Sequence, residues 1–336
     1  MKQERQVEVK FYVGSFPFYS SSTHAKVDES CGFHQMEMGK LGKLYTGLIM
    51  LSLIWGTSFV FIKVLVSEMG FWEVVFWRCL FGALTLWIIL LVKKRPVKWN
   101  ELPWFKIMAV GLLNNTLPWG LIALSETVIS SSLASILNAT TPIFTSIIGF
   151  LFFHRVLKGR QWAGIGVGFF GMFLLSGIQG QDFVNGDFIG IGTMIGAAIC
   201  YGYSSQYVKK HLTHIPPIVM AAVSLSFAAC FAVMLAMFNG PLHLTKLADV
   251  ETLASIIGLG SFGSGIAILI FYFLIQRGSA EFASTVTYLV PITAMLWGVL
   301  FLDEIITKHM FIGLVLVLIG VYMSTYKKKQ EEKGHA

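Results

Sequence analysis

Ten long apolar stretches divide this chain, and they constrain its fold more than any other feature. They cover roughly residues 45–67, 72–92, 105–125, 130–153, 161–178, 188–208, 217–238, 251–275, 280–302 and 308–326. A helix needs about 20 apolar residues to cross a bilayer, and these stretches have about that length. The linkers are short, and only 13% of the 336 residues are charged. The sequence therefore predicts a membrane protein and excludes a water-soluble globule.

The apolar stretches are predicted to be helices. They lack the alternating pattern of a barrel strand, and each exceeds the roughly 10 residues that such a strand needs. Within lipid, only helices and closed barrels satisfy every backbone hydrogen bond. We therefore expect an all-α polytopic membrane protein with ten transmembrane helices.

Positive charge is concentrated in alternate linkers. One set, called the basic side below, includes KKR at 93–95 and KKK at 327–329. The other set, called the acidic side, carries mainly Asp and Glu, among them Asp303 and Glu304. Because basic loops usually face the cytoplasm, we expect a multi-pass protein of the cell membrane with both termini cytoplasmic. The net charge of +7 then reflects orientation and does not predict a nucleic-acid partner.

The two ends of the chain and the cysteines predict little chemistry. Residues 1–43 are expected to form a disordered cytoplasmic tail, and residues 327–336 a basic cytoplasmic tail. An alternative for the first tail is that the natural protein starts at Met36 or Met38. The first tail lacks the apolar core of a cleaved signal peptide. Three of the four cysteines lie within apolar stretches, where a thiol usually behaves as a small hydrophobe. We expect no disulfide, no metal site and no cofactor.

The chain repeats itself. A shift of 149 positions aligns residues 131–171 with residues 280–320 without a gap, so that Pro142 meets Pro291 and further glycines coincide. A shift of 146 similarly aligns the first stretch with the sixth. Such agreement indicates a duplicated five-helix unit, at residues 44–178 and 188–326. Chance similarity among apolar helices is the alternative, but it rarely matches both Pro and Gly without gaps.

An odd number of helices per unit inverts the second copy in the membrane. Secondary transporters commonly use inverted repeats of this kind, with a substrate site near the bilayer centre. The charges after the fourth helix of each unit agree with inversion. His154 and Arg155 fall on the basic side, whereas Asp303 and Glu304 fall on the acidic side.

Three motifs carry a family resemblance. They are LIWGTSFVFIK from residue 53, ISSSLASILNATTPIFT from residue 129 and PITAMLWGVLFLDE from residue 291. Together they resemble the drug/metabolite transporter superfamily, in particular its EamA-type ten-helix members, over about residues 44–326. The resemblance implies a transporter of small organic solutes in which helices five and ten are structural props or dimer contacts. It also implies an acid at the end of the fourth helix, where this chain has Arg155 but keeps the repeat partner Glu304.

Polar side chains near the centre of a membrane helix are candidates for substrate binding, because they are costly unless they face protein or a cavity. An aromatic pair on helices one and six is a candidate wall for an organic ligand. The substrate-binding candidates are Trp55, Asn115, Thr116, Asn138, Thr141, Tyr201, Thr287 and Tyr288. Asn115 is favoured over Asn114 because consecutive helical residues point about 100° apart. The alternative is that the hydroxyls bond back to their own helices and that the aromatic rings only pack.

Two prolines are expected to bend or gate the bundle. Pro142 and Pro291 lack an amide hydrogen, so each should leave the carbonyl four residues earlier, at Asn138 or Thr287, unpaired at mid-depth. Such a carbonyl can bind a ligand. Bending for helix packing alone is the alternative.

Two cations in the first two helices allow different interpretations. Arg78 is a candidate for holding an anionic group or for gating. The structural alternative is that Arg78 and Lys63 extend outward and meet Glu68 or Glu73.

The leading hypothesis is a secondary transporter that moves an amino-acid-like solute or drug by alternating access, with export preferred. Its cavity is expected at mid-membrane, between helices one, three, four, six, eight and nine. The alternative is a membrane-embedded enzyme for a lipid or isoprenoid substrate, but no catalytic cluster of His, Asp or Glu lies inside the apolar stretches. Acids such as Glu126 and Glu304 are at the ends of stretches, so proton coupling, exchange and facilitated diffusion all stay open. The expected partners are a small-molecule substrate and the bilayer, with a homodimer as a further option.

Overall fold

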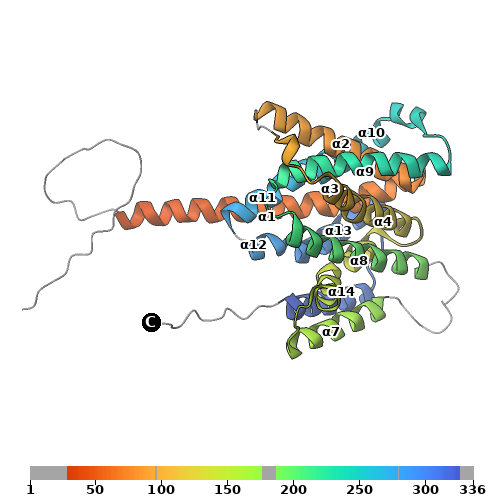
Figure 1. The fold of residues 1–336 in the computed structure, drawn as a ribbon. Helices are drawn as coiled ribbons and strands as arrows, with labels where there is room; N and C mark the ends of the chain where they lie inside the picture. The colour runs from red at the N-terminus through yellow and green to blue at the C-terminus, as the bar shows by residue number, and fades with distance from the viewer. Residues whose placement is uncertain (1–28, 95–96, 176–186, 279, 326–336) are drawn as a thin grey trace, which may run out of the picture. The chain divides into compact units, whose positions relative to one another are not determined.

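A computed structural model of the chain describes residues 29–94, 97–175, 187–278 and 280–325 (Figure 1). It divides into two units, residues 1–42 and 43–336, and the second contains all that follows. Of the predicted N-terminal tail, residues 29–43 belong to helix α1. Residues 1–28 and 326–336, with most of both predicted tails, lie outside the described residues.

Every regular element in the described residues is a helix. They are α1 (Glu29–Glu68), α2 (Phe71–Val92), η1 (Trp99–Glu101), α3 (Trp104–Val110), η2 (Gly111–Thr116), α4 (Leu117–Val128), α5 (Ser131–Asn138), α6 (Thr141–Phe153), α7 (Gly159–Leu175), α8 (Asp187–His211), α9 (Pro217–Asn239), η3 (Leu244–Ala248), α10 (Val250–Ile257), η4 (Gly258–Ile266), α11 (Ala267–Arg277), α12 (Ala280–Ser284), α13 (Val286–Leu302) and α14 (Lys308–Thr325). Nine helical segments in the described residues are long and apolar enough to cross a membrane. The remaining predicted span corresponds to α7, described over 17 residues. The prediction of an all-α polytopic membrane protein is confirmed.

Four predicted helices are interrupted within their length. The third contains η2 between α3 and α4, and the eighth contains η4 between α10 and α11. The fourth is divided into α5 and α6, and the ninth into α12 and α13. The interruptions thus fall in the third and fourth spans and again in the eighth and ninth.

The wide turns η2 and η4 are π-helical, and each contains a side-chain hydroxyl bonded to a backbone carbonyl of the same turn. In η2 the Thr116 hydroxyl donates to the carbonyl of Gly111, five residues earlier (3.1 Å). In η4 the Ser264 hydroxyl donates in the same way to the carbonyl of Leu259 (3.3 Å). Each hydroxyl thus bonds to the carbonyl that the amide of its own residue faces in a π turn. Inserted π turns of this kind are frequent at functional sites.

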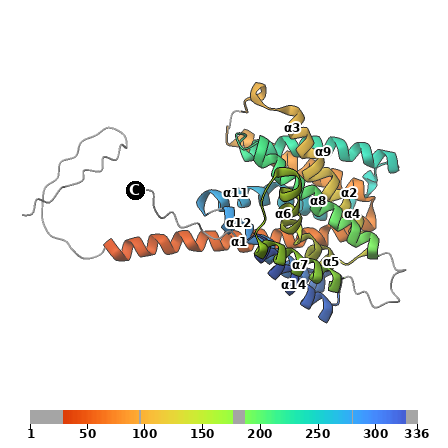
Figure 2. The ribbon, with the colours of Figure 1, turned by 60° about the horizontal axis from the view of Figure 1, so that its bottom comes forward.

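Helices α7 and α14 pack along each other, as Figures 1 and 2 both show. Their glycines permit this contact, because a Cβ added at Gly320 would lie 2.5 Å from the amide nitrogen of Gly168 and 2.7 Å from the carbonyl oxygen of Gly164. Small residues allow two backbones to approach this closely in membranes. The fifth and tenth spans therefore pack together, and their propping role stays a prediction.

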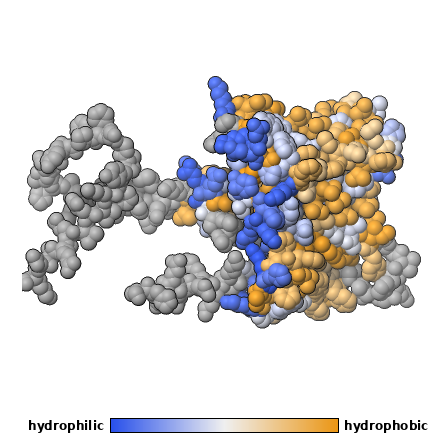
Figure 3. Space-filling model, in the orientation of Figure 1, coloured by the Kyte–Doolittle hydropathy of each residue, from blue (hydrophilic) through white to orange (hydrophobic). Residues whose placement is uncertain are grey.

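The surface of residues 43–336 has the pattern of a membrane protein. Figure 3 shows hydrophilic residues gathered mainly along one edge of the face in view, and a mostly hydrophobic remainder. Large apolar side chains are exposed along the helices, for example Phe170, Phe173 and Phe311. A soluble protein rarely exposes so much contiguous apolar surface, whereas lipid solvates it.

Candidate functional site

A cavity of about 500 Å³ lies among the helices. It is lined by Trp55, Ser58, Phe59, Ile62, Arg78, Asn114, Asn115, Trp119, Ile122, Ser135, Asn138, Ala139, Thr141, Thr145, Tyr201, Ser205, Gly263, Ser264, Ile268, Phe271, Ser284, Val286, Thr287, Val290 and Pro291. All four interrupted spans contribute to this lining. The sequence predicts a cavity among spans one, three, four, six, eight and nine, and the structure adds α2 through Arg78.

Most of the predicted site residues lie around this cavity. The lining includes Trp55, Arg78, Asn115, Asn138, Thr141, Tyr201, Thr287 and Pro291. Their proposed roles in binding or gating stay predictions, but the structure brings these eight side chains into one place.

Three predicted site residues are not in the cavity lining. Thr116 is fully buried, and its hydroxyl bonds to backbone carbonyls of Gly111 and Ala228. The Tyr288 hydroxyl lies 3.4 Å from the Thr325 hydroxyl oxygen of α14. Pro142 follows the break in the fourth span, whereas its neighbour Thr141 reaches the cavity. The predicted alternative of a hydroxyl bonded back to its own helix describes the contact of Thr116, and also those of Thr141 and Thr287 within their spans.

Both neighbouring asparagines of η2 reach the cavity, although only Asn115 is favoured from the sequence. The Asn114 amide donates to the Asn115 side-chain oxygen (3.4 Å), and the Asn115 amide donates to the Ser224 hydroxyl (3.3 Å). The favoured residue is the more buried one, with 5% exposure. The π turn changes the angular spacing of a regular helix, on which the sequence argument depends.

The break in the fourth span places Asn138 at the end of α5. Its carbonyl accepts the Thr141 hydroxyl (2.7 Å), so the expectation of an unpaired carbonyl at this position is wrong. The unpaired acceptor at this position is a side-chain oxygen and not a backbone carbonyl. The side-chain Oδ1 of Asn138 is buried and has no hydrogen-bond partner among the described residues. A buried acceptor without a donor is costly, and a ligand N–H would satisfy it.

Arg78 is buried and directed at the cavity. Its Nε donates to the Ser264 hydroxyl (2.9 Å), and its guanidinium carbon lies 3.8 Å from the ring centroid of Trp119. The described lining holds no other Lys or Arg and no Asp or Glu. The cavity therefore combines one fixed positive charge with neutral polar and aromatic groups, which favours an anionic group on the ligand.

Neither cation of the first two spans meets the acids suggested by the sequence. The Lys63 ammonium donates to the carbonyls of Glu126 (2.6 Å) and Ile129 (2.9 Å), at the C-terminal end of α4. A cation is stabilised there because the helix dipole is negative at that end. Glu68 pairs instead with Lys246, and Glu73 with His243.

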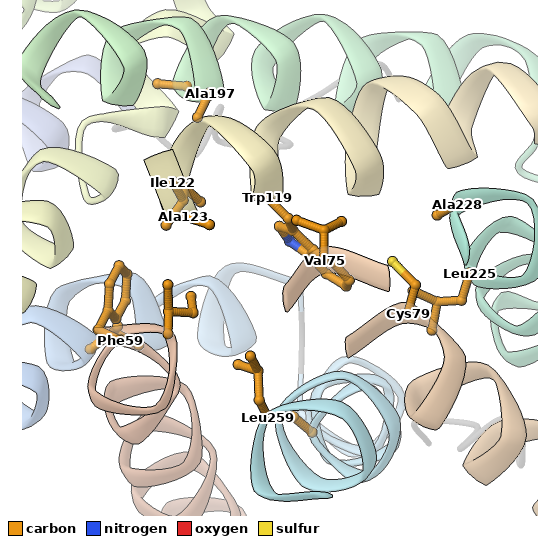
Figure 4. Close-up of a cluster of buried hydrophobic side chains, with 14 of the residues drawn as sticks. Phe59, Val75, Cys79, Trp119, Ile122, Ala123, Ala197, Leu225, Ala228 and Leu259 are labelled. Atoms are coloured by element: carbon orange, nitrogen blue, oxygen red, sulfur yellow. The ribbon is translucent and has the colours of Figure 1, made fainter. Parts of the chain in front are cut away.

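Aromatic side chains form part of the cavity wall. Of these, the sequence predicts only Trp55 and Tyr201 as site residues. Phe59 of α1 and Trp119 and Ile122 of α4 line the cavity, and Figure 4 shows these three side chains within a cluster of buried hydrophobic residues. The indole Nε1 of Trp55 donates to the carbonyl of Gly263 (3.2 Å), and its ring lies 5.6 Å from that of Phe271.

Helical spacing would have found many of the missed lining residues. Residues three or four apart share a face of a helix. Phe59 follows Trp55 by four, Trp119 follows Asn115 by four, and Ser135 precedes Asn138 by three. In the same way, Thr145 follows Thr141, and Ser205 follows Tyr201.

On the acidic side of the cavity, Glu304 joins the two halves of the chain. Its carboxylate accepts the backbone amides of Ser131 (2.7 Å) and Ser132 (3.0 Å) and the Ser132 hydroxyl. An acid at this position caps the first turn of α5 and meets the positive end of its dipole. The contact holds the end of the ninth span against the start of the fourth.

Fold and cavity together define a class of protein, namely a polytopic helical membrane protein with an internal polar and aromatic chamber. The EamA-like transporter family matches residues 43–177 and again residues 188–326. The chain belongs to this family of membrane transporters, as the motifs quoted above suggest. Membership favours a transporter over the membrane-embedded enzyme.

Two bacterial relatives are also named as transporters. The chain is 24% identical to the uncharacterized transporter YoaV of Bacillus subtilis (strain 168), over 84% of this chain and 97% of that protein. It is 26% identical to the uncharacterized inner membrane transporter YedA of Escherichia coli (strain K12), over 87% and 94%. A protein known from a crystal structure shares the fold with a TM-score of 0.58 and 16% identity, over 84% of this chain and 96% of that one.

Proposed function

We propose that this protein is a secondary transporter of the cell membrane that exports small amino-acid-like metabolites by alternating access. The observation that carries this proposal is the composition of the cavity. A single buried arginine, an unpartnered amide oxygen and aromatic walls surround about 500 Å³. These groups complement a small molecule with one anionic group, one N–H donor and an apolar body.

Each end of such a zwitterion has a counterpart in the lining. The carboxylate pairs with the Arg78 guanidinium, which Ser264 and Trp119 hold in position. The ammonium donates to Oδ1 of Asn138. The apolar side chain packs between Trp55 and Phe271.

Alternating access follows from the inverted duplication, which we propose for residues 44–178 and 188–326. Two features support it. The helices are interrupted in spans three, four, eight and nine, and spans four and nine both end in a left-handed residue, His154 and Asp303. With both termini in the cytoplasm, Glu304 closes the cavity toward the outside, as loading of an exported substrate requires.

Transport by purified protein in sealed vesicles tests the proposal. A zwitterionic amino acid with an apolar side chain, its decarboxylated amine and its des-amino acid form a matched panel, each measured with and without a pH gradient. We expect the zwitterion to move at least tenfold faster than the amine, because only the zwitterion can pair with Arg78. Failure to move any amino acid, nucleoside or organic cation would contradict the transporter proposal.

Two variants assign the ends of the substrate. Asn138→Leu removes the orphan acceptor and should preserve insertion while slowing transport about tenfold. Arg78→Gln should abolish the preference for the zwitterion over its amine. Gly166→Ala is the control, because a Cβ at this exposed position would meet nothing within 4 Å. Normal turnover in Asn138→Leu would remove Asn138 from the site.

A further inference from the structure

Glu126 is a buried acid without a partner in a membrane helix. It lies in the last turn of α4 and has 0% exposure. Neither oxygen of its carboxyl group has a hydrogen-bond partner among the described residues. The sequence places this acid at the end of a span, where water would solvate it, but the structure encloses it completely. Acids in this situation are functional candidates, because burying them without a partner is costly.

The charges near Glu126 are engaged by other groups. Three charged side chains act electrostatically on its carboxyl group, namely Lys63 of α1, Arg78 of α2 and Glu304 at the end of α13. Lys63 donates to two backbone carbonyls, one of them that of Glu126 itself. Arg78 is held by Ser264 and Trp119. Glu304 caps α5 and adds a repelling negative charge.

These surroundings favour the protonated acid in this conformation. An ionised carboxylate that loses its water and gains no hydrogen bond is penalised far more than a neutral carboxylic acid. The nearby Lys63 reduces the penalty, but its ammonium makes no ion pair with the carboxyl group in the described residues. We therefore expect Glu126 to carry a proton in the conformation that the structure describes.

Glu126 occupies the layer between the cavity and the acidic side. Ile122, one helical turn earlier on the same face of α4, lines the cavity. The contact of Glu304 with Ser131 and Ser132, on the acidic side, is close enough for Glu304 to act electrostatically on the Glu126 carboxyl group. A conformation that opens the cavity toward the acidic side must separate this layer and admit water to Glu126.

We infer that Glu126 is a proton-binding site that stabilises the closure of the cavity on the acidic side, holding its proton while Glu304 caps α5 and releasing it to water when that side opens. This inference rests on the proposed alternating access. The closed form binds one proton more than the open form, so acid favours the closed form. Protonation of Glu304 would act with the opposite sign, because it would weaken the cap on α5.

Cysteine labelling measures this equilibrium without any substrate. Ser135→Cys introduces a nearly isosteric thiol into the cavity lining, in a background whose four native cysteines are replaced. A membrane-impermeant maleimide is applied from the acidic side of sealed vesicles between about pH 5 and pH 9. Rates are divided by those of the same protein carrying Glu126→Gln, which removes the intrinsic pH dependence of the thiol reaction.

We expect this ratio to rise by up to about tenfold per pH unit across the titration of Glu126 and then to level off. Glu126→Asp should keep the rise, and Glu68→Gln, at an exposed acid paired with Lys246, should leave the profile unchanged. A ratio that stays flat would overturn the role of Glu126, and so would a ratio that falls with pH. Absence of labelling from this side at every pH would instead overturn alternating access, and this inference with it.

Discussion

The fourth and ninth spans have corresponding sequences but different interruptions. In the fourth, α5 and α6 are separated at Ala139 and Thr140, and Pro142 is the second residue of α6. In the ninth, the separation is at Thr285, and Pro291 lies inside the continuous helix α13. Proline therefore does not by itself determine where these helices break. The two spans also differ in how the amides of their first turns are capped.

The start of the fourth span has an acidic cap, which the ninth span cannot receive from the corresponding position. Glu304 accepts the first amides of α5, which is eight residues long. The repeat partner of Glu304 is Arg155, and a guanidinium group has no acceptor for an amide. The opening helix of the ninth span, α12, has five residues. We propose that this difference favours closure on the acidic side over closure on the basic side.

Loss of the acidic cap should have the largest effect. Glu304→Ala removes three accepted hydrogen bonds, two from amides at the positive end of α5, and should cost about 2 kcal/mol. Labelling of Ser135→Cys from the acidic side should then rise tenfold or more. Arg155→Ala is the matched control, and it should change that labelling by less than about twofold. Equal effects of the two variants would contradict the asymmetry.

The two prolines should differ in effect as well. Pro142→Ala restores an amide that can donate to the carbonyl of Asn138 in place of the Thr141 hydroxyl, and so favours one continuous helix. Transport should slow about fivefold while insertion is preserved, because switching needs the break. Pro291→Ala only completes a bond within α13 and should stay within about twofold of wild type.

Transport rates and the yield of folded protein, measured together, test this difference. Similar slowing in both variants would mean that the break and the internal proline act alike. Loss of folded protein in either variant would favour a packing role for that proline.

An acid introduced at position 155 should favour closure of the cavity on the basic side. Arg155→Glu supplies an acceptor at the position that corresponds to Glu304, and a helix cap typically contributes about 1 kcal/mol. Labelling of Ser205→Cys, a cavity residue of α8, from the basic side should fall about threefold. Arg155→Gln is the control for removing the positive charge. A fall of the same size in that control would assign the effect to charge loss and not to a cap.

The periodicity and polarity of the sequence were sufficient to predict the helical fold and much of the cavity. Central polar residues such as Asn138 and Asn115 could be identified because lipid penalises them wherever they do not face protein or a cavity. The breaks could not be placed, since Thr285 has no proline beside it and the cap on α5 comes from Glu304, 173 residues away from Ser131. The burial of Glu126 could not be predicted either. It depends on how other helices, such as α8 and α1, pack against α4, and not on its place in the chain.

The smallest effect on labelling should come from Gly298→Ala and Gly149→Ala, which each add a methyl group near the C-terminal end of the ninth or fourth span. A Cβ at Gly298 would lie 2.6 Å from Oε2 of Glu304 and 2.7 Å from the Ser132 hydroxyl oxygen, so Gly298→Ala must displace the cap. At Gly149 the nearest atom would be Cδ of Arg155 at 2.9 Å, part of a flexible stem. Labelling of Ser135→Cys from the acidic side should therefore rise about twofold in Gly298→Ala and stay unchanged in Gly149→Ala. If both variants raise it equally, the cap is not what distinguishes the two spans, and the asymmetry must come from their breaks alone.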